Sequence, residues 1–192
     1  MLEKIGSIKK SLDTGNYLAA LALALSIPDI CGQVEYPNLS GKGHTGERYK
    51  KWFDNYIFDD YNATGASPFY NPNIQLGKNG LTLKELIPPD FTSDDCYQLR
   101  CAVLHSGNTD MDLSKVNFQR FKIVVDKDEN AILSGVNYTF GQPTKDAYVH
   151  LNLLRFCNII CEKAEQCYNN HKSEFNQYHI NIEIVDNNKT AI

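Results

Sequence analysis

The chain has 192 residues, slightly more than one typical domain of about 150 residues. Apolar residues make up 42% of it, charged residues make up 22%, and the net charge is −4 at pH 7. These values are typical of a globular protein and exclude a fibrous protein, a disordered tail and a histone-like coat for nucleic acid. A nuclease is compatible with them, because it needs only a local positive groove.

The sequence predicts a cytoplasmic protein with reduced thiols and no membrane segment. Its longest apolar run, Tyr17 to Leu25, stops at Ser26 and Pro28, short of the roughly 18 residues that span a bilayer. The charged N-terminus lacks the apolar run and cleavage site of a secretory signal. Without an oxidising compartment, the six cysteines are expected to be free.

Helical periodicity dominates the first 107 residues. A segment that is apolar on nearly every face follows Asn16 and is expected to lie in the centre of a bundle and to end before Pro28. Thr45 is expected to cap the next helix, and Thr92 or Ser93 the one after it. Residues 59–80 are predicted to form a long loop. The predicted helices span 2–12, about 16–27, 46–58 and 94–105.

The pattern changes after residue 107. Residues 116–126 and 131–140 mix β-branched and aromatic residues and predict a β-hairpin. A long helix is expected from Thr144 to about His171, and residues 178–186 alternate like a strand. The sequence therefore predicts a mainly α single domain over 1–192. Its helical core is expected over about 1–107 and 144–172, and its small β appendage over about 115–140 and 178–186.

The letters Gly41-Lys-Gly-His-Thr-Gly46 match the GxGxxG pattern of dinucleotide sites. That fold needs a buried strand before the first glycine, and the preceding QVEYPNLS is not apolar. A loop leading into a helix is the better interpretation, although the first turn of that helix could hold one phosphate. The cations that would help to bind RNA or phosphate there are Lys42, Arg48, Lys50 and Lys51.

Cysteine spacing does not favour a metal site. Cys157 and Cys161 are four residues apart, Cys96 and Cys101 are five apart, and no CxxC knuckle occurs. Buried thiols are therefore the better interpretation. His150 lies on the apolar stripe of the predicted long helix, where a buried core histidine is the default and an active-site role the alternative.

The most informative pair is Arg100 and His105, an R-x4-H pattern at the end of a predicted helix. Five residues at about 100° each leave ideal directions about 140° apart, but a long arginine can still converge with a histidine in the last turn. A fixed cation beside a titratable imidazole suits phosphodiester cleavage. The structural alternative pairs Arg100 with Asp94 or Asp95 and makes His105 a helix cap.

The R-x4-H pair and its surroundings resemble HEPN-like bacterial proteins. The segments that carry the resemblance are LALALSIPDICG, GERYKKWFDNY and LRCAVLHSGN, and the similarity covers roughly residues 16–107 and the long helix from 144. HEPN domains carry R-x4–6-H and include many metal-independent RNases of toxin–antitoxin, abortive-infection and CRISPR systems. In the subgroup modified by partner nucleotidyltransferases the motif is R-x4-H-x-Y, whereas this chain has Gly107 at the last position.

The resemblance implies an antiparallel helical bundle that forms a homodimer, with two motifs in one cleft and neither a metal nor another cofactor. Arg100 would bind the scissile phosphate, and His105 would move a proton while the RNA 2′-OH attacks. An antitoxin or another protein partner is a further expectation. The alternative is a non-catalytic HEPN-like module that binds RNA, a nucleotide or a protein.

Overall fold

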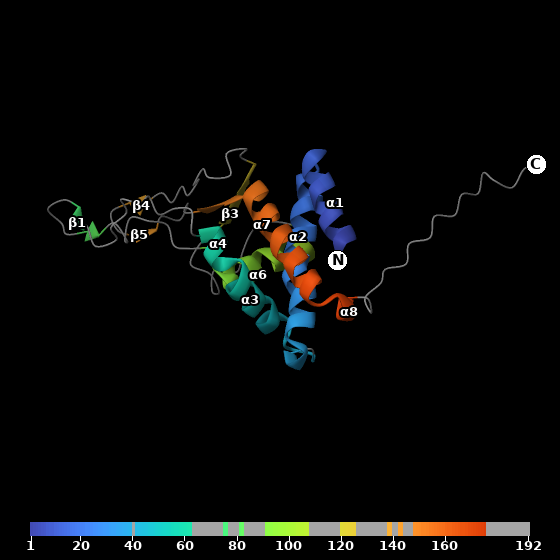
Figure 1. Cartoon of the computed structure of the whole chain (residues 1–192). Helices are drawn as coiled ribbons and strands as arrows, with labels where there is room; N and C mark the ends of the chain where they lie inside the picture. Colours follow the sequence, from blue (N-terminus) through green and yellow to red (C-terminus); the bar gives the residue numbers. More distant parts are fainter. Residues whose placement is uncertain are drawn as a thin grey trace, which may run out of the picture.

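A computed structural model describes residues 1–39, 41–62, 75–76, 81–82, 91–107, 120–125, 138–139, 142–143 and 148–175. Most of these residues are helical, as the sequence predicts, and Figure 1 shows α1, α2 and α7 side by side with α3 and α6 packed next to them. The helices are α1 (Leu2–Asp13), α2 (Tyr17–Glu35), η1 (Pro37–Leu39), α3 (Thr45–Tyr56), α4 (Phe58–Asn62), α6 (Ser93–Cys101), η3 (Ala102–Ser106), α7 (Leu153–Asn170) and α8 (Lys172–Phe175).

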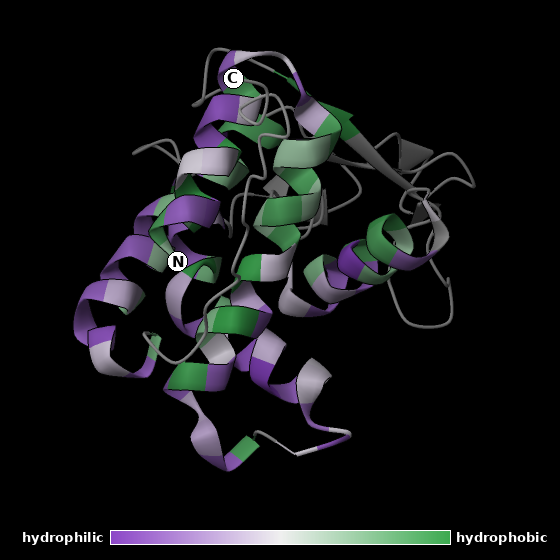
Figure 2. Ribbon diagram, turned by 90° about the vertical axis from the view of Figure 1, so that its right-hand side faces the viewer, coloured by the Kyte–Doolittle hydropathy of each residue, from purple (hydrophilic) through white to green (hydrophobic). Residues whose placement is uncertain are grey.

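Helix α2 is the centre of the bundle. It contacts α1, α3, α6 and α7, and Ala24, Leu25 and Ile27 on it are fully buried. Figure 2 shows how hydrophobic residues form bands along helices that also carry hydrophilic ones. By length and composition α2 would also suffice to cross a membrane, a test that buried core helices pass as well, and half of the tested window is buried here. The central position predicted for this helix is confirmed.

The predicted end of α2 before Pro28 is wrong. The helix continues to Glu35, although an interior proline removes one backbone hydrogen bond and costs about 3 kcal/mol. Burial of the segment after the proline offsets this cost, since Cys31 is fully buried. Gly32 permits the close approach of α3, because a Cβ on it would lie 3.0 Å from the carbonyl oxygen of Arg48.

The β elements pair differently from the predicted hairpin. Strand β3 (Arg120–Val124) pairs in parallel with β6 (Tyr148–Asn152), with Lys122 opposite His150. Strand β4 (Tyr138–Thr139) pairs with β5 (Gln142–Pro143), and β1 (Gln75–Leu76) pairs with β2 (Leu81–Thr82), both antiparallel. The predicted strand over 178–186 lies outside the described residues.

The long helix begins later than its predicted start at Thr144. Residues 148–152 form a strand, and α7 begins at Leu153 after Asn152, whose side chain accepts a hydrogen bond from the backbone N–H of Arg155 at 3.3 Å. This N-cap marks the true start of the helix. The backbone of His150 therefore belongs to a strand and not to the apolar stripe of a helix.

The cysteines provide a first testable prediction. Five of the six thiols are buried and only Cys101 is partly exposed. Burial raises the pKa of Cys96 to about 12, that of Cys157 to about 12 and that of Cys161 to about 11, so these thiols stay protonated at pH 8. Brief iodoacetamide treatment of the native protein at pH 8 should therefore label Cys101 and leave the other five unmodified in a peptide mass analysis.

Denatured protein serves as the control and should be labelled at all six positions. Rapid native labelling of Cys96 would contradict its place in the core.

Candidate functional site

A well-formed cap anchors the beginning of α6. The Thr92 hydroxyl accepts the backbone N–H of Asp95 at 3.2 Å, and the Asp95 carboxylate accepts the backbone N–H of Thr92 at 2.9 Å. This reciprocal pair is a capping box, and it confirms Thr92 as the cap. Burial raises the pKa of the Asp95 carboxyl from its ordinary value, against the lowering effect of these hydrogen bonds. Asp95 is thus committed to the helix start.

The end of α6 widens into a π-helical turn, η3, which brings Arg100 and His105 together. In this turn the backbone N–H of Gly107 donates to the carbonyl of Ala102, five residues earlier, and Gly107 adopts a left-handed φ of 66°. An i to i+5 turn stacks residues five apart, whereas an ideal α-helix would direct them about 140° apart. Arg100 Nη1 lies 3.0 Å from His105 Nε2. The predicted convergence therefore comes from a π-turn, a rare feature often found at functional sites.

The chemistry of this contact defines the state of the histidine. An arginine carries only donors and stays protonated, so Nη1 donates and Nε2 of His105 accepts. This hydrogen bond requires an unprotonated Nε2, which is the tautomer with its proton on Nδ1. Nε2 of the exposed His105 is therefore a proton acceptor that faces the Arg100 guanidinium.

Arg100 has no counter-charge among the residues that the structure describes. Asp94 pairs with Lys50, with Nζ and Oδ1 2.5 Å apart, and Asp95 caps its own helix. The Nε atom of Arg100 is buried and has no hydrogen-bond partner in the described part of the chain. Both acidic partners of the structural alternative are thus engaged elsewhere, and the guanidinium keeps its full charge for an anion.

One aromatic ring, that of Tyr97, lies near two cations. Lys50 Nζ lies 5.7 Å from the centroid of the Tyr97 ring, and Arg100 Cζ lies 5.9 Å from the same centroid. Because α3 packs against α6, Lys50 joins Arg100 although they are far apart in the sequence. Sequence analysis singled out Lys50 and Arg100 but missed Tyr97, which the i, i+3 spacing before Arg100 could have indicated.

The other predicted cations lie elsewhere. Arg48 is buried, with Nη2 2.8 Å from Asp29 Oδ1 and Nη1 donating to the Leu39 carbonyl at 3.1 Å, so its guanidinium holds α3 to α2 and η1. Lys51 is exposed, and its Nζ lies 4.5 Å from the centroid of the Tyr36 ring. Lys42 is exposed in the loop before α3. Of these four described cations, Lys50 is the one whose Nζ lies near the Tyr97 ring that Arg100 also approaches.

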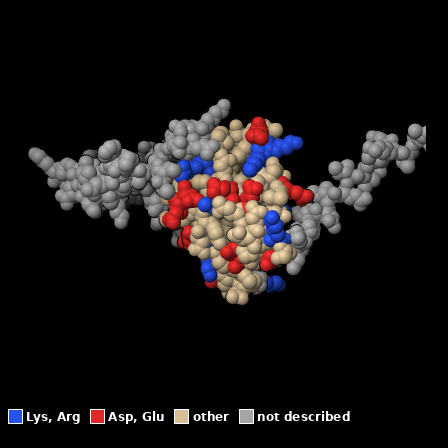
Figure 3. All heavy atoms as spheres, in the orientation of Figure 1, with Lys and Arg blue, Asp and Glu red and all other residues tan. Residues whose placement is uncertain are grey.

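Figure 3 shows acidic and basic side chains scattered over this face of the described part, with uncharged surface between many of them. On this face RNA would meet local groups of cations and not a continuous basic band.

Two other sequence patterns carry no site in the described residues. The GxGxxG segment follows η1 and not a strand, which agrees with a loop that leads into α3. Among the same residues no group of three histidine, cysteine or acidic side chains could hold a metal ion. The side chain of His150 lies outside the described part, so its role stays a prediction.

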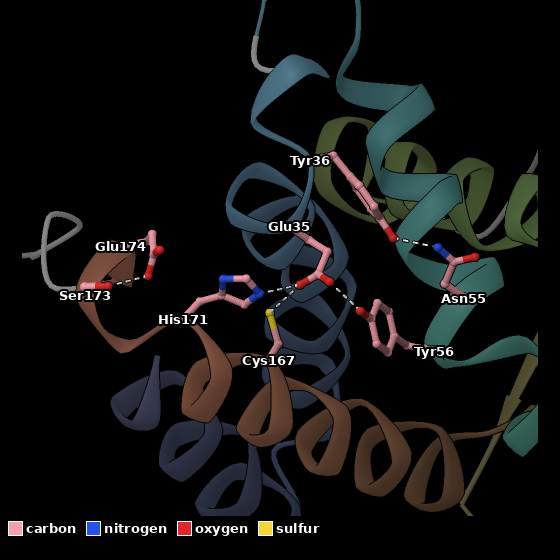
Figure 4. A network of polar contacts seen from close by, with 8 residues as sticks. All are labelled: Glu35, Tyr36, Asn55, Tyr56, Cys167, His171, Ser173 and Glu174. Atoms are coloured by element: carbon pink, nitrogen blue, oxygen red, sulfur yellow. Dashed lines mark hydrogen bonds and ion pairs between the residues drawn. The ribbon is translucent and has the colours of Figure 1, made fainter.

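Sequence analysis also missed a polar network at the other end of the bundle (Figure 4). Glu35 accepts a hydrogen bond from the Tyr56 hydroxyl at 2.5 Å and lies 2.9 Å from Nε2 of His171. Burial, together with Glu35, raises the pKa of Tyr56. The Cys167 thiol also faces Glu35, at 3.9 Å. This network ties the C-terminal ends of α2 and α7 to α3.

The comparisons with known proteins found no matching family model, no matching curated protein and no matching solved structure. Function is therefore argued from the residues of the site.

Proposed function

We propose that this chain is a metal-independent RNA endonuclease of HEPN type, with Arg100 and His105 as its reacting residues. The observation that carries the proposal is the 3.0 Å contact, formed by a π-turn at a helix end, between the His105 imidazole and a guanidinium with no counter-charge among the described residues. The sequence resemblance to HEPN-like proteins supports the same assignment.

The chemistry requires a base, a cation and an acid. Nε2 of His105 takes the proton of the RNA 2′-OH while its oxygen attacks the adjacent phosphorus. The Arg100 guanidinium exchanges its hydrogen bond to His105 Nε2 for hydrogen bonds to the phosphate. There it stabilises the charge that develops on the phosphoryl oxygens. The bond to the 5′-oxygen breaks, and this oxygen takes a proton from the second His105 of the dimer, which must start in its protonated form. A 2′,3′-cyclic phosphate is left on the upstream fragment.

The proposal is tested by incubating the purified protein with single-stranded RNA and a DNA of the same sequence, with a chelator present. RNA should be cut and DNA should persist, because DNA lacks the attacking 2′-OH. Binding of RNA without any cleavage would favour the alternative, a non-catalytic HEPN-like module.

A composite site predicts a homodimer. In a twofold dimer the same patch of each copy meets itself, and the exposed Leu104 next to His105 is an apolar candidate for that patch. Light scattering at micromolar concentration should give twice the 21.7 kDa mass of one chain, and Leu104→Glu should lower it to that of a monomer. A strict monomer for the unmodified chain would remove the two-motif mechanism.

RNA affinity should depend on Lys50 more than on Lys51. Lys50 lies near the same Tyr97 ring as Arg100, whereas Lys51 lies over the Tyr36 ring. A phosphate would compete with the exposed Asp94 carboxylate for Lys50. Loss of one phosphate contact lowers the slope of log affinity against log salt by about 0.7 for a single strand. Lys50→Ala should show this decrease in a fluorescence titration, and Lys51→Ala, its neighbour and matched control, should keep the original slope. Equal slopes for all three proteins would place Lys50 outside the RNA-binding surface.

A further inference from the structure

The ring of Tyr97 is fixed on several sides. A Cβ added to Gly46 would lie 3.2 Å from Cζ of Tyr97, so the ring lies almost on the backbone of the first turn of α3. Tyr49 packs against the same ring edge-on, with centroids 5.3 Å apart. Lys50, one turn further along α3, also lies near the ring. The ring position is therefore set by α3, although Tyr97 belongs to α6.

Arg100, in contrast, is held by few contacts. Its only hydrogen bond among the described residues goes to the exposed His105, and its Nε has no partner. An arginine side chain has about 2 kcal/mol of rotamer entropy to lose, so one such bond is a weak restraint. The Tyr97 ring, 5.9 Å from Cζ, supplies the second contact, a cation–π interaction.

From these contacts we infer that Tyr97 is a positioning residue of the site. Its ring is held by α3 and in turn determines where the Arg100 guanidinium lies. This inference deepens the proposed function and rests on it for its effect on catalysis. Tyr97 does not touch the reacting atoms. It keeps Arg100 near Nε2 of His105, so that the cation is in place when a phosphate arrives.

The hydroxyl of Tyr97 makes no hydrogen bond within the described part of the chain, so the ring alone should carry this role. Tyr97→Phe is therefore a matched control that keeps the ring, and Tyr97→Leu removes it. Gly46→Ala is a third variant that leaves every polar group in place and pushes on the ring from α3.

The test records the Nε–H signal of Arg100 in ¹⁵N-labelled protein, assigned by its loss in Arg100→Ala, and the cleavage of single-stranded RNA with a chelator present. Tyr97→Leu should move the signal toward that of a free arginine and lower kcat roughly fivefold, as expected when about 1 kcal/mol of positioning is lost. Tyr97→Phe should retain the signal position and kcat.

An Arg100 signal at the original position in Tyr97→Leu would overturn the inference. If Tyr97→Leu does not fold, Gly46→Ala decides, because the added methyl group must displace the ring and shift the same signal, and an unchanged signal there would equally overturn it. If no RNA is cut even by the unmodified protein, the proposed function fails, whereas the Arg100 signal still decides whether Tyr97 positions the guanidinium.

Discussion

His105→Ala should lower RNA cleavage by roughly 10²- to 10⁴-fold, the usual contribution of a general acid–base group. Arg100→Ala should lower it by roughly 10²- to 10³-fold, the usual contribution of one group that stabilises transition-state charge. The fold should be retained in both, because His105 is exposed and surface substitutions change the free energy of unfolding by about 0.5 kcal/mol. Arg100→Ala also loses the contact with Tyr97, worth about 1 kcal/mol at most at a partly exposed site. Single-turnover cleavage and thermal unfolding of each variant measure the two effects separately.

The double variant shows whether the two residues serve one chemical step. Residues that act as a unit are strongly non-additive, so Arg100→Ala/His105→Ala should be about as inactive as either single variant. Lys51→Ala is the control for a nearby cation outside the pair, and its cleavage rate should be unchanged. An Arg100→Ala protein that melts early but cuts RNA at the full rate would show that Arg100 is structural.

Arg48→Ala should have the largest effect on stability. Its guanidinium contacts the Asp29 carboxylate and the Leu39 carbonyl inside the bundle, and the side chain is only 8% exposed. Removing one partner of a buried ion pair leaves the other charge without compensation and costs about 3–5 kcal/mol. Because Asp29 is 20% exposed, we expect about 3 kcal/mol, which corresponds to a decrease in Tm of roughly 6–12 °C for a chain of this size.

Two variants calibrate this prediction. Lys51→Ala removes an exposed cation from the same helix and should leave Tm within about 2 °C. Asp29→Asn also leaves a charge without compensation, but its amide oxygen can still accept a hydrogen bond from Arg48 and no cavity forms, so it should be less destabilising than Arg48→Ala. An Arg48→Ala protein that keeps its Tm but binds RNA weakly would show that Arg48 binds RNA, as the sequence predicts, and is not part of a core ion pair.

Local patterns predicted the helices well where caps and burial agree. Thr92 and the largely apolar α2 each follow a rule of short range, and the structure has them in their expected roles. Pro28 misled the prediction because its cost is local, whereas the burial that offsets it comes from neighbouring helices. The start of α7 was misplaced because residues 148–152 pair with β3, a partner far away in the sequence.

The candidate site was only partly predictable, because its geometry also depends on features that short-range rules do not capture. The R-x4-H spacing identified Arg100 and His105, but an ideal helix would have kept them apart, and no short-range rule indicated the π-turn. Arg48 and Lys50 are two residues apart on one helix and equally basic in the sequence. Only the packing of α3 against both α2 and α6 separates a core ion pair from a cation of the candidate site.

The most direct test of the proposed chemistry is the mass of the RNA fragments that the purified protein produces with a chelator present. Attack by the 2′-OH predicts upstream fragments that end in a 2′,3′-cyclic phosphate and downstream fragments that begin with a 5′-hydroxyl, both absent with His105→Ala. Fragments with 3′-hydroxyl and 5′-phosphate ends, or cleavage by His105→Ala at the unmodified rate, would contradict the assignment of Arg100 and His105 as the reacting pair.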